Sequence, residues 1–407
     1  MKKIVMLCLS AGIQKTISFE CFAPGEVNRS KSYRYDASGK AINSARVLMQ
    51  LVGETRSDVA NSSAVRKDSS ASVASSSADV SVSIVCPLGE RNKDFFLEMA
   101  AADSLNVRCV PIPGFTRECC TLLDEKSGQA TELVVEEPVP TVDSTPYEEK
   151  LMELFAAELG ISNDCKVGER NGLTSGGIEN ADCGGVSCAA RITDSPCKAD
   201  ALLFSGSRPK FWSAGLIKRI AAMAKENGIL FMADFRGNDL LSILDEYTPD
   251  IIKINEDEFW ATFGINSPAT FVRESPAIFG SDSTNGADCV ASGKENADGT
   301  IDEGCTSSAS DHEERLSAAI AEKSRMLNNI IVVTRGSKKT LAAEKGKPYH
   351  SMSERIKAVN TIGCGDAFNA GFLYEYLITK DMQKSLEKGK WCASRNAECL
   401  RPGVLQD

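Results

Sequence analysis

The chain has 407 residues, 42% of them hydrophobic, with a formal net charge of −10 and a pI near 5.1. An acidic protein is repelled by nucleic-acid phosphates and anionic membrane surfaces, so we expect neither as a partner. The fifteen cysteines form no CxxC pair and the only histidines are His312 and His350, which argues against a zinc site or a histidine-based triad. An odd number of scattered cysteines suits reduced thiols, and we expect a cytoplasmic protein.

The beginning of the chain superficially resembles a signal peptide. The apolar run of residues 4–9 is short, however, and Gln14 and Lys15 follow almost at once. We interpret the run as a buried strand. No apolar run approaches the roughly 20 residues needed to span a membrane, so no membrane partner is expected.

Three segments lack apolar periodicity and are rich in small and polar residues: 56–80, 162–199 and 275–312. We interpret them as surface insertions. Residues 295–299 hint at a calcium loop, but Lys294 and Cys305 would take the first and last ligand positions. The remainder suits one large domain, so we expect a single domain over residues 1–407.

The first half of the core predicts strands and two helices. The strands with a polar alternation suit a sheet that has one wet face. In chain order we expect a strand at 4–9, polar strands at 16–22 and 26–35, a helix at 40–52, a strand at 82–86, a helix at 94–103, and strands at 107–112, 119–123 and 130–135.

The second half alternates short apolar strands with helices. We expect strands at 201–204, 229–233, 251–254 and 330–334. We expect helices at 211–227 and 313–327, a short helix that begins at Asn238, and another helix that runs through Trp260. This alternation predicts an α/β fold with right-handed crossovers and a parallel sheet that is covered on both faces. Ligands bind such sheets beyond the carboxyl ends of the strands.

A glycine-rich turn runs from Gly363 through Cys364 to Gly365 and leads into an apolar helix. Free N–H groups at a helix start, with the positive end of the helix dipole, bind anions. Asp366 in the first turn has two interpretations. It either stabilises the helix dipole, or acts as a base while the helix start holds developing negative charge.

Other sites have a functional and an ordinary interpretation. Gly39 and Lys40 form a second glycine turn before a helix, where Lys40 binds an anion and Asn43 a hydroxyl, or where the lysine is merely solvated. Arg117 suits bidentate phosphate binding, although most surface arginines have no such role. Ser205 follows a buried strand, beside small residues that permit the close approach of a ligand.

An acidic run follows another strand end. Asn255 and Glu258 provide oxygen ligands for Mg²⁺, or Asn255 caps a helix whose first turn is acidic. The chain contains no Walker A sequence, GxxxxGK[ST], which excludes a P-loop kinase.

Several of these motifs resemble one family. Residues 360–366, NTIGCGD, look like the NTxGxGD signature of the ribokinase-like (PfkB) sugar kinases. Residues 24–29 and 38–48 are similar to the PGEVNR…GGKGINVARVL of the 1-phosphofructokinase and tagatose-6-phosphate kinase branch. Residues 121–133, 205–207, 253–258 (family KxNxxE) and 333–336 match in the same order. The resemblance covers nearly the whole core and skips the three insertions.

The resemblance implies a fold and an assembly. The ribokinase-like fold has three layers: a mainly parallel central sheet, helices on both of its faces, and in addition a small β-sheet lid. The strands near 16–35 and 107–135 would form this lid, which excludes water. In the family the lid often builds a homodimer, so a homodimer through the lid is expected here.

The resemblance also implies roles for individual residues, with ATP and Mg²⁺ as cofactors. Asp366 would be the base, with the N–H groups of Gly363, Cys364, Gly365 and Asp366 as the anion hole, and Asn255 and Glu258 would organise Mg²⁺. The nucleotide-binding residues would be Thr334, Gly336, Thr361 and Asn396. The substrate-binding residues would be Gln14, Gly39, Lys40, Asn43, Arg117 and Ser205.

Departures from the family pattern lie mainly on the sugar side. Gln14 replaces the Asp of NPAxD, Ser38 and Ala41 replace glycines of GGKG, and Cys119 stands where Asn is usual. Lys339 replaces a glycine of the nucleotide turn, and Arg208 could add a phosphate contact.

The sequence predicts ATP- and Mg²⁺-dependent phosphorylation of a sugar phosphate to a bisphosphate. Fructose 1-phosphate, tagatose 6-phosphate and fructose 6-phosphate represent the substrate class. One alternative is a kinase of an unphosphorylated sugar or nucleoside. Another is a degenerate, non-catalytic protein that binds sugar phosphate or nucleotide.

Overall fold

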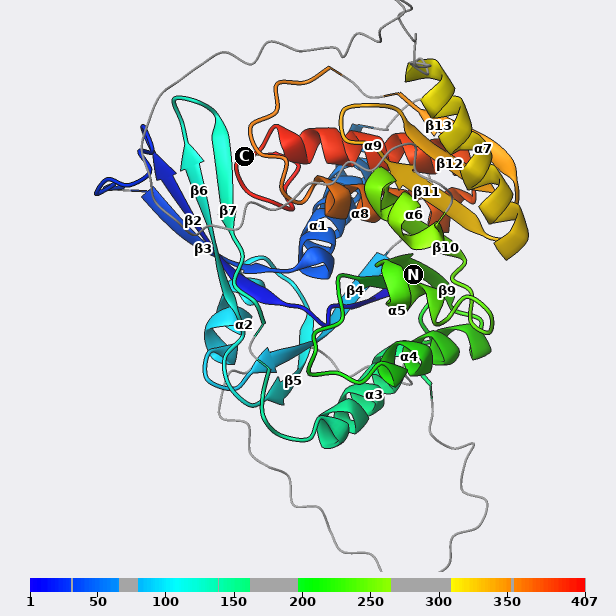
Figure 1. The fold of residues 1–407 in the computed structure, drawn as a ribbon, viewed down its shortest axis with the longest axis horizontal. Helices are drawn as coiled ribbons and strands as arrows, with labels where there is room; N and C mark the ends of the chain where they lie inside the picture. Colours follow the sequence, from blue (N-terminus) through cyan, green and yellow to red (C-terminus); the bar gives the residue numbers. More distant parts are fainter. Residues whose placement is uncertain are drawn as a thin grey trace, which may run out of the picture.

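The computed structural model describes residues 1–30, 32–65, 80–137, 139–161, 197–264, 309–352 and 355–406. A nine-stranded sheet forms its centre (Figure 1). In spatial order its strands are β13 (Lys347–Ser351), β12 (Thr340–Glu344), β11 (Ile330–Thr334), β10 (Ile251–Asn255), β9 (Leu230–Asp234), β8 (Ala201–Ser205), β1 (Lys2–Leu7), β4 (Val80–Gly89) and β5 (Val107–Ile112). The strands from β11 to β5 are parallel, whereas β12 and β13 add an antiparallel edge.

Each face of this sheet packs into its own hydrophobic core. Along β1, Ile4 and Met6 belong to one buried cluster, whereas Val5 and Leu7 belong to the other. Successive side chains of a strand point to opposite faces, so a strand that is covered on both sides must be apolar throughout. This requirement explains the continuous apolar runs of the central strands.

The helices lie on both faces of the sheet. One core includes side chains from α1 (Lys40–Val65), α2 (Lys93–Ala102), α8 (Cys364–Thr379) and α9 (Met382–Ala397). The other core includes side chains from α3 (Thr145–Leu159), α4 (Gly215–Glu226), α5 (Gly237–Leu241), α6 (Glu256–Phe263) and α7 (Ala309–Leu327). None of the helices in the described ranges is both long enough and apolar enough to cross a bilayer.

A second sheet of four strands stands to one side of the main sheet (Figure 1). Its spatial order is β3 (Ser32–Ser38), β2 (Gly12–Phe19), β6 (Glu118–Asp124) and β7 (Gln129–Leu133). In β6, buried and less buried residues alternate, and the outermost strand β7 is exposed along its whole length. This sheet is the predicted lid, and β3 leads directly into α1 at Lys40.

The predicted three-layer α/β fold is confirmed, with three corrections to its parts. β5 was expected in the lid, but it pairs with β4 and forms an edge of the main sheet. β3 begins at Ser32, so residues 26–30 are not strand. Helix α1 continues to Val65, which makes residues 56–65 helical rather than part of an insertion.

The structure also contains elements that the sequence reading omitted. These are α3, the antiparallel strands β12 and β13, and α9. Helix α7 begins at Ala309, so residues 309–312 are helical rather than inserted. Residue 80 begins β4, and residues 197–199 are described but lie in no helix or strand. The rest of the predicted insertions, residues 66–79, 162–196 and 275–308, lies outside the described residues, as does the calcium-loop hint.

Candidate active site

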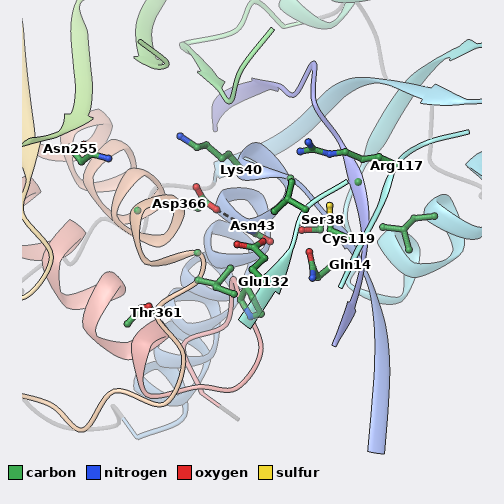
Figure 2. A pocket seen from close by; sticks show the side chains of 18 of the residues that line it. Gln14, Ser38, Lys40, Asn43, Arg117, Cys119, Glu132, Asn255, Thr361 and Asp366 are labelled. Carbon is green, nitrogen blue, oxygen red and sulfur yellow. Dashed lines mark hydrogen bonds between the residues drawn. The ribbon is translucent and has the colours of Figure 1, made fainter. Parts of the chain in front are cut away.

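A pocket of about 660 Å³ lies between the lid and the carboxyl ends of the parallel strands (Figure 2). Most of the predicted site residues meet there, although they come from distant parts of the chain. Those that line the pocket are Gln14, Gly39, Lys40, Asn43, Arg117, Asn255, Glu258, Thr334, Thr361, Gly363, Gly365 and Asp366.

The glycine turn at the start of α8 leaves little room for side chains. Gly363 has a φ of 80°, and an added Cβ there would lie 3.1 Å from the Pro402 Cβ. A Cβ on Gly365 would lie 2.9 Å from the Lys253 ammonium nitrogen. The turn therefore brings the first N–H groups of α8, which lack intrahelical partners, to the pocket wall.

Asp366 lies in the first turn of α8 and is only 7% exposed. Its Oδ2 accepts a hydrogen bond from the Asn43 Nδ2 at 2.9 Å, which Figure 2 shows as a dashed line. Burial, and then the negative charge of Asp234, raise the pKa of Asp366 to about 6; Lys40, Asn43 and Lys253 oppose this rise. A carboxylate with a pKa near neutrality is well suited to accept a proton.

Asp234, at the end of β9, is a site residue that the sequence reading missed. It is 1% exposed, and its Oδ2 accepts hydrogen bonds from the Ser205 hydroxyl at 2.7 Å and the Asn369 amide at 2.8 Å. Its Oδ1 lies 3.5 Å from Lys40 Nζ and 3.6 Å from Lys253 Nζ. Burial raises the pKa of Asp234, but Lys253 and Lys40 together hold it below its ordinary value.

The buried carboxylate changes how two predicted site residues are understood. The attraction of Asp234 raises the pKa of Lys40, so the ammonium remains charged beside Asp366. Ser205 is fully buried and turns its hydroxyl to Asp234, so it does not line the pocket. Since Asp234 ends a buried parallel strand, its position at the ligand-binding edge was a signal that could have identified it.

Gln14, which was expected to bind the sugar, lies on the lid side of the pocket. The Gln14 amide donates to the Thr121 hydroxyl at 2.8 Å and is 8% exposed. Arg208 could add a phosphate contact according to the sequence, but in the structure it makes contacts within the protein. Its guanidinium instead donates to Asp239 at 3.0 Å and to the Trp212 carbonyl at 2.6 Å, and it does not line the pocket.

Three predicted site residues lie beside the pocket rather than on its wall. Asn396 is fully buried; its amide donates to the Ile362 carbonyl at 2.9 Å and its oxygen accepts from the Gly403 N–H at 2.6 Å, so it supports the glycine turn from behind. The Cys364 thiol accepts weakly from the same amide at 3.5 Å. The Gly336 carbonyl accepts from Lys390 Nζ at 2.8 Å.

Comparisons with known proteins agree with this geometry. Residues 302–403 match the family described as pfkB family carbohydrate kinase. The predicted resemblance to PfkB kinases is confirmed. The predicted class of enzyme, a carbohydrate kinase, is confirmed by the same match. None of the curated proteins compared with the chain matches it significantly.

Solved structures of PfkB-type proteins share the fold. Phosphofructokinase-2 from Escherichia coli in complex with fructose-6-phosphate matches 98% of this chain over 94% of its own, at 15% identity and a TM-score of 0.64. A possible 1-phosphofructokinase from Thermotoga maritima matches 98% of this chain over 93% of its own, at 15% identity and a TM-score of 0.64. A tetrameric inhibited form of the Escherichia coli protein has a TM-score of 0.62, at 15% identity, with 98% and 94% covered.

Asn255 and Glu258, the residues of the PfkB resemblance expected to organise Mg²⁺, form a capping box at the start of α6. The Glu258 N–H donates to Asn255 Oδ1 at 2.8 Å, and Glu258 Oε2 accepts from the Asn255 N–H at 3.0 Å. Both residues still line the pocket. Mg²⁺ in phosphoryl-transfer sites commonly takes one or two carboxylates and completes its shell with phosphates and water, and this donor set fits that pattern.

Proposed function

We propose that the protein transfers the γ-phosphoryl group of ATP, with Mg²⁺, to a hydroxyl of a phosphorylated ketose and forms a bisphosphate. The acceptor class is that of fructose 1-phosphate, tagatose 6-phosphate or fructose 6-phosphate. The observation that carries the proposal is the position of Asp366. Its buried carboxylate lies at the N-terminus of α8, in a pocket that also contains Lys40 and Arg117.

Asp366 would accept the proton of the attacking hydroxyl. As the sugar oxygen bonds to the γ-phosphorus, the bond from that phosphorus to the bridging oxygen of ATP breaks, and ADP takes the electron pair. The N–H groups of the first turn of α8 would hydrogen-bond to the oxygens on which negative charge develops. Lys40 and Lys253 add positive charge on the same side of the pocket.

Asn255 and Glu258 are the residues that would hold Mg²⁺. The bound ion neutralises phosphate charge and orients the phosphates of the nucleotide. Thr334 and Thr361 line the pocket and would contact the donor.

The lid would protect the reaction from water. Gln14 and Cys119 of β2 and β6, and Glu132 of β7, line the pocket from the lid side. Exclusion of water matters because water would otherwise accept the phosphoryl group. We further propose that the lid forms a homodimer interface, because its exposed apolar residues include Tyr33 at 66% and Leu133 at 50%.

A kinase of an unphosphorylated sugar is the second candidate, and one observation favours it. The two cations expected to bind the substrate phosphate both lie near carboxylates: Lys40 near Asp234 at 3.5 Å, and Arg117 near Glu137 at 3.6 Å. A neutral sugar would not compete with these contacts. The fructose-6-phosphate bound to the Escherichia coli relative supports the phosphorylated class instead.

A coupled assay of ADP release tests the proposal. Purified protein with ATP and Mg²⁺ is offered the three ketose phosphates, and fructose, ribose and adenosine as neutral acceptors. We expect turnover with at least one ketose phosphate and its loss in Asp366→Asn. Turnover with neutral acceptors alone would contradict the proposed substrate class, and an unchanged rate in Asp366→Asn would contradict the assignment of the base.

A further inference from the structure

Arg117 immediately precedes the lid strand β6, and its side chain lines the pocket. Its side chain is 23% exposed, and its Nε is buried with no hydrogen-bond partner among the described residues. It lies over Gly12, where an added Cβ would approach Arg117 Cγ and Nε to 3.5 Å. Because a guanidinium carries five donors in a planar fork, this one retains capacity for an anionic ligand.

Glu137 is the carboxylate nearest to this guanidinium. It follows β7 at the end of residues 134–137, and its Oε1 lies 3.6 Å from Arg117 Nε. The same oxygen accepts a hydrogen bond from the Ser10 hydroxyl, and the side chain is 18% exposed. Burial raises the pKa of Glu137 above its ordinary value, and the bond from Ser10 and the charge of Arg117 only partly oppose this rise.

The two residues approach the sugar pocket differently. Arg117 lines the 660 Å³ pocket, whereas Glu137 is not among its lining residues. Both line a neighbouring pocket of about 260 Å³, together with residues 134–136 and 207–210. Arg117 therefore stands between the sugar pocket and the carboxylate. The 3.6 Å separation is longer than a hydrogen bond, so Glu137 acts on Arg117 through charge rather than by fixing its orientation.

We propose that Glu137 lowers the selectivity for phosphorylated over neutral sugars, an inference that rests on the proposed function. A phosphate that enters the pocket and binds Arg117 competes with Glu137 for the charge of the guanidinium. Glu137 thereby weakens the binding of phosphate-bearing substrates and leaves neutral sugars unaffected. The residue acts through Arg117 and does not touch the sugar.

Glu137→Gln tests this role because it removes the charge and keeps an oxygen that can accept from Ser10. Glu136→Gln is the matched control, since the Glu136 side chain is 94% exposed and pairs only loosely with Lys210, at 3.8 Å. Calorimetry gives dissociation constants for fructose 1-phosphate, fructose 6-phosphate, tagatose 6-phosphate and fructose. We expect Glu137→Gln to bind the phosphorylated ketoses about tenfold more tightly, with fructose unchanged. The Glu136→Gln control should match the wild type.

Arg117→Met completes a double-mutant cycle with Glu137→Gln. If Glu137 acts through Arg117, its substitution has no further effect once the guanidinium is gone. Equal changes for phosphorylated and neutral sugars, a loss of phosphosugar affinity, or no phosphosugar binding in either wild type or Glu137→Gln would overturn the inference. A selective gain in binding without any phosphoryl transfer would support the inference and contradict the proposed function alone.

Discussion

The Asn43 amide nitrogen lies 2.9 Å from the Asp366 carboxylate and joins the first turn of α1 to the first turn of α8. The other atom of the same amide, Oδ1, accepts from the Arg46 guanidinium at 3.1 Å. Arg46 in turn donates to Asp103 at 2.8 Å. Because Arg46 can only donate, it holds the amide with its oxygen toward Arg46 and its nitrogen toward Asp366. The base therefore receives a fixed donor on one oxygen.

Arg46→Lys should slow the reaction by about tenfold in kcat, since lysine keeps the charge but not the guanidinium fork. Loss of the oriented Asn43 donor also removes a hydrogen bond to the ionised form of Asp366, which raises the pKa of the base. The acid limb of the kcat profile should then move to higher pH. An unaltered limb with only a lower melting temperature would show that Arg46 has a purely structural role.

The rate should depend on pH through Asp366 itself. The base acts only when ionised, so kcat should fall as the pH drops through about 6, the pKa to which burial and Asp234 raise this carboxyl. Asp234→Asn removes the like charge and should shift the acid limb to lower pH. Profiles for both proteins measure this shift, and coincident profiles would contradict the electrostatic coupling of the two carboxylates.

Asp366→Asn should lower activity and raise stability. Folding shifts the pKa of Asp366 from 3.8 to about 6. Above pH 6 the ionised, buried carboxylate thus costs the folded state roughly 3 kcal/mol. The substitution removes this cost, while kcat should fall by about 10² to 10⁴. Thermal unfolding at pH 7.5 should show a higher melting temperature for Asp366→Asn, and the difference from wild type should shrink toward pH 4 as Asp366 takes up its proton.

Gly363→Ala should destabilise the fold and impair transfer. The residue has a φ of 80°, and the new Cβ would meet the Pro402 Cβ at 3.1 Å. Backbone strain alone costs about 1 to 2 kcal/mol. Gly336→Ala serves as the control in unfolding experiments, because Gly336 has a φ of 59° but open space around its Cβ position. A larger loss of unfolding free energy at Gly363 than at Gly336 supports close packing behind the turn, and equal losses would contradict it.

Local sequence patterns predicted the parts of the fold that depend on neighbours along the chain. The alternation of β8, β9, β10 and β11 with helices is visible as apolar runs and amphipathic stretches, and the glycine turn before Asp366 is visible as a motif. Pairing between strands is not local. β5 could have joined either sheet, and only its register with β4, with Ile84 opposite Val107, decides the matter.

Two further omissions have different causes. Helix α3 carries Leu151, Phe155 and Leu159 at helical spacing, so the sequence did contain its signal. The Asp234 site could not be assembled from sequence spacing, because its lysines come from α1 and β10 and meet only when the strands align. At Asn255 the structure shows the helix cap, and because the residue also lines the pocket, its role toward Mg²⁺ stays a prediction.

The central claim is that Asp366 activates a sugar hydroxyl for attack on ATP. Mass spectrometry of the sugar pool tests this claim directly. Wild type and Asp366→Asn are each incubated with ATP, Mg²⁺ and each ketose phosphate, and the products are measured. The account predicts a bisphosphate from wild type and at least a hundredfold less from Asp366→Asn at the same protein concentration. Equal amounts of bisphosphate from both proteins, or none from wild type with any of the ketose phosphates, would contradict it.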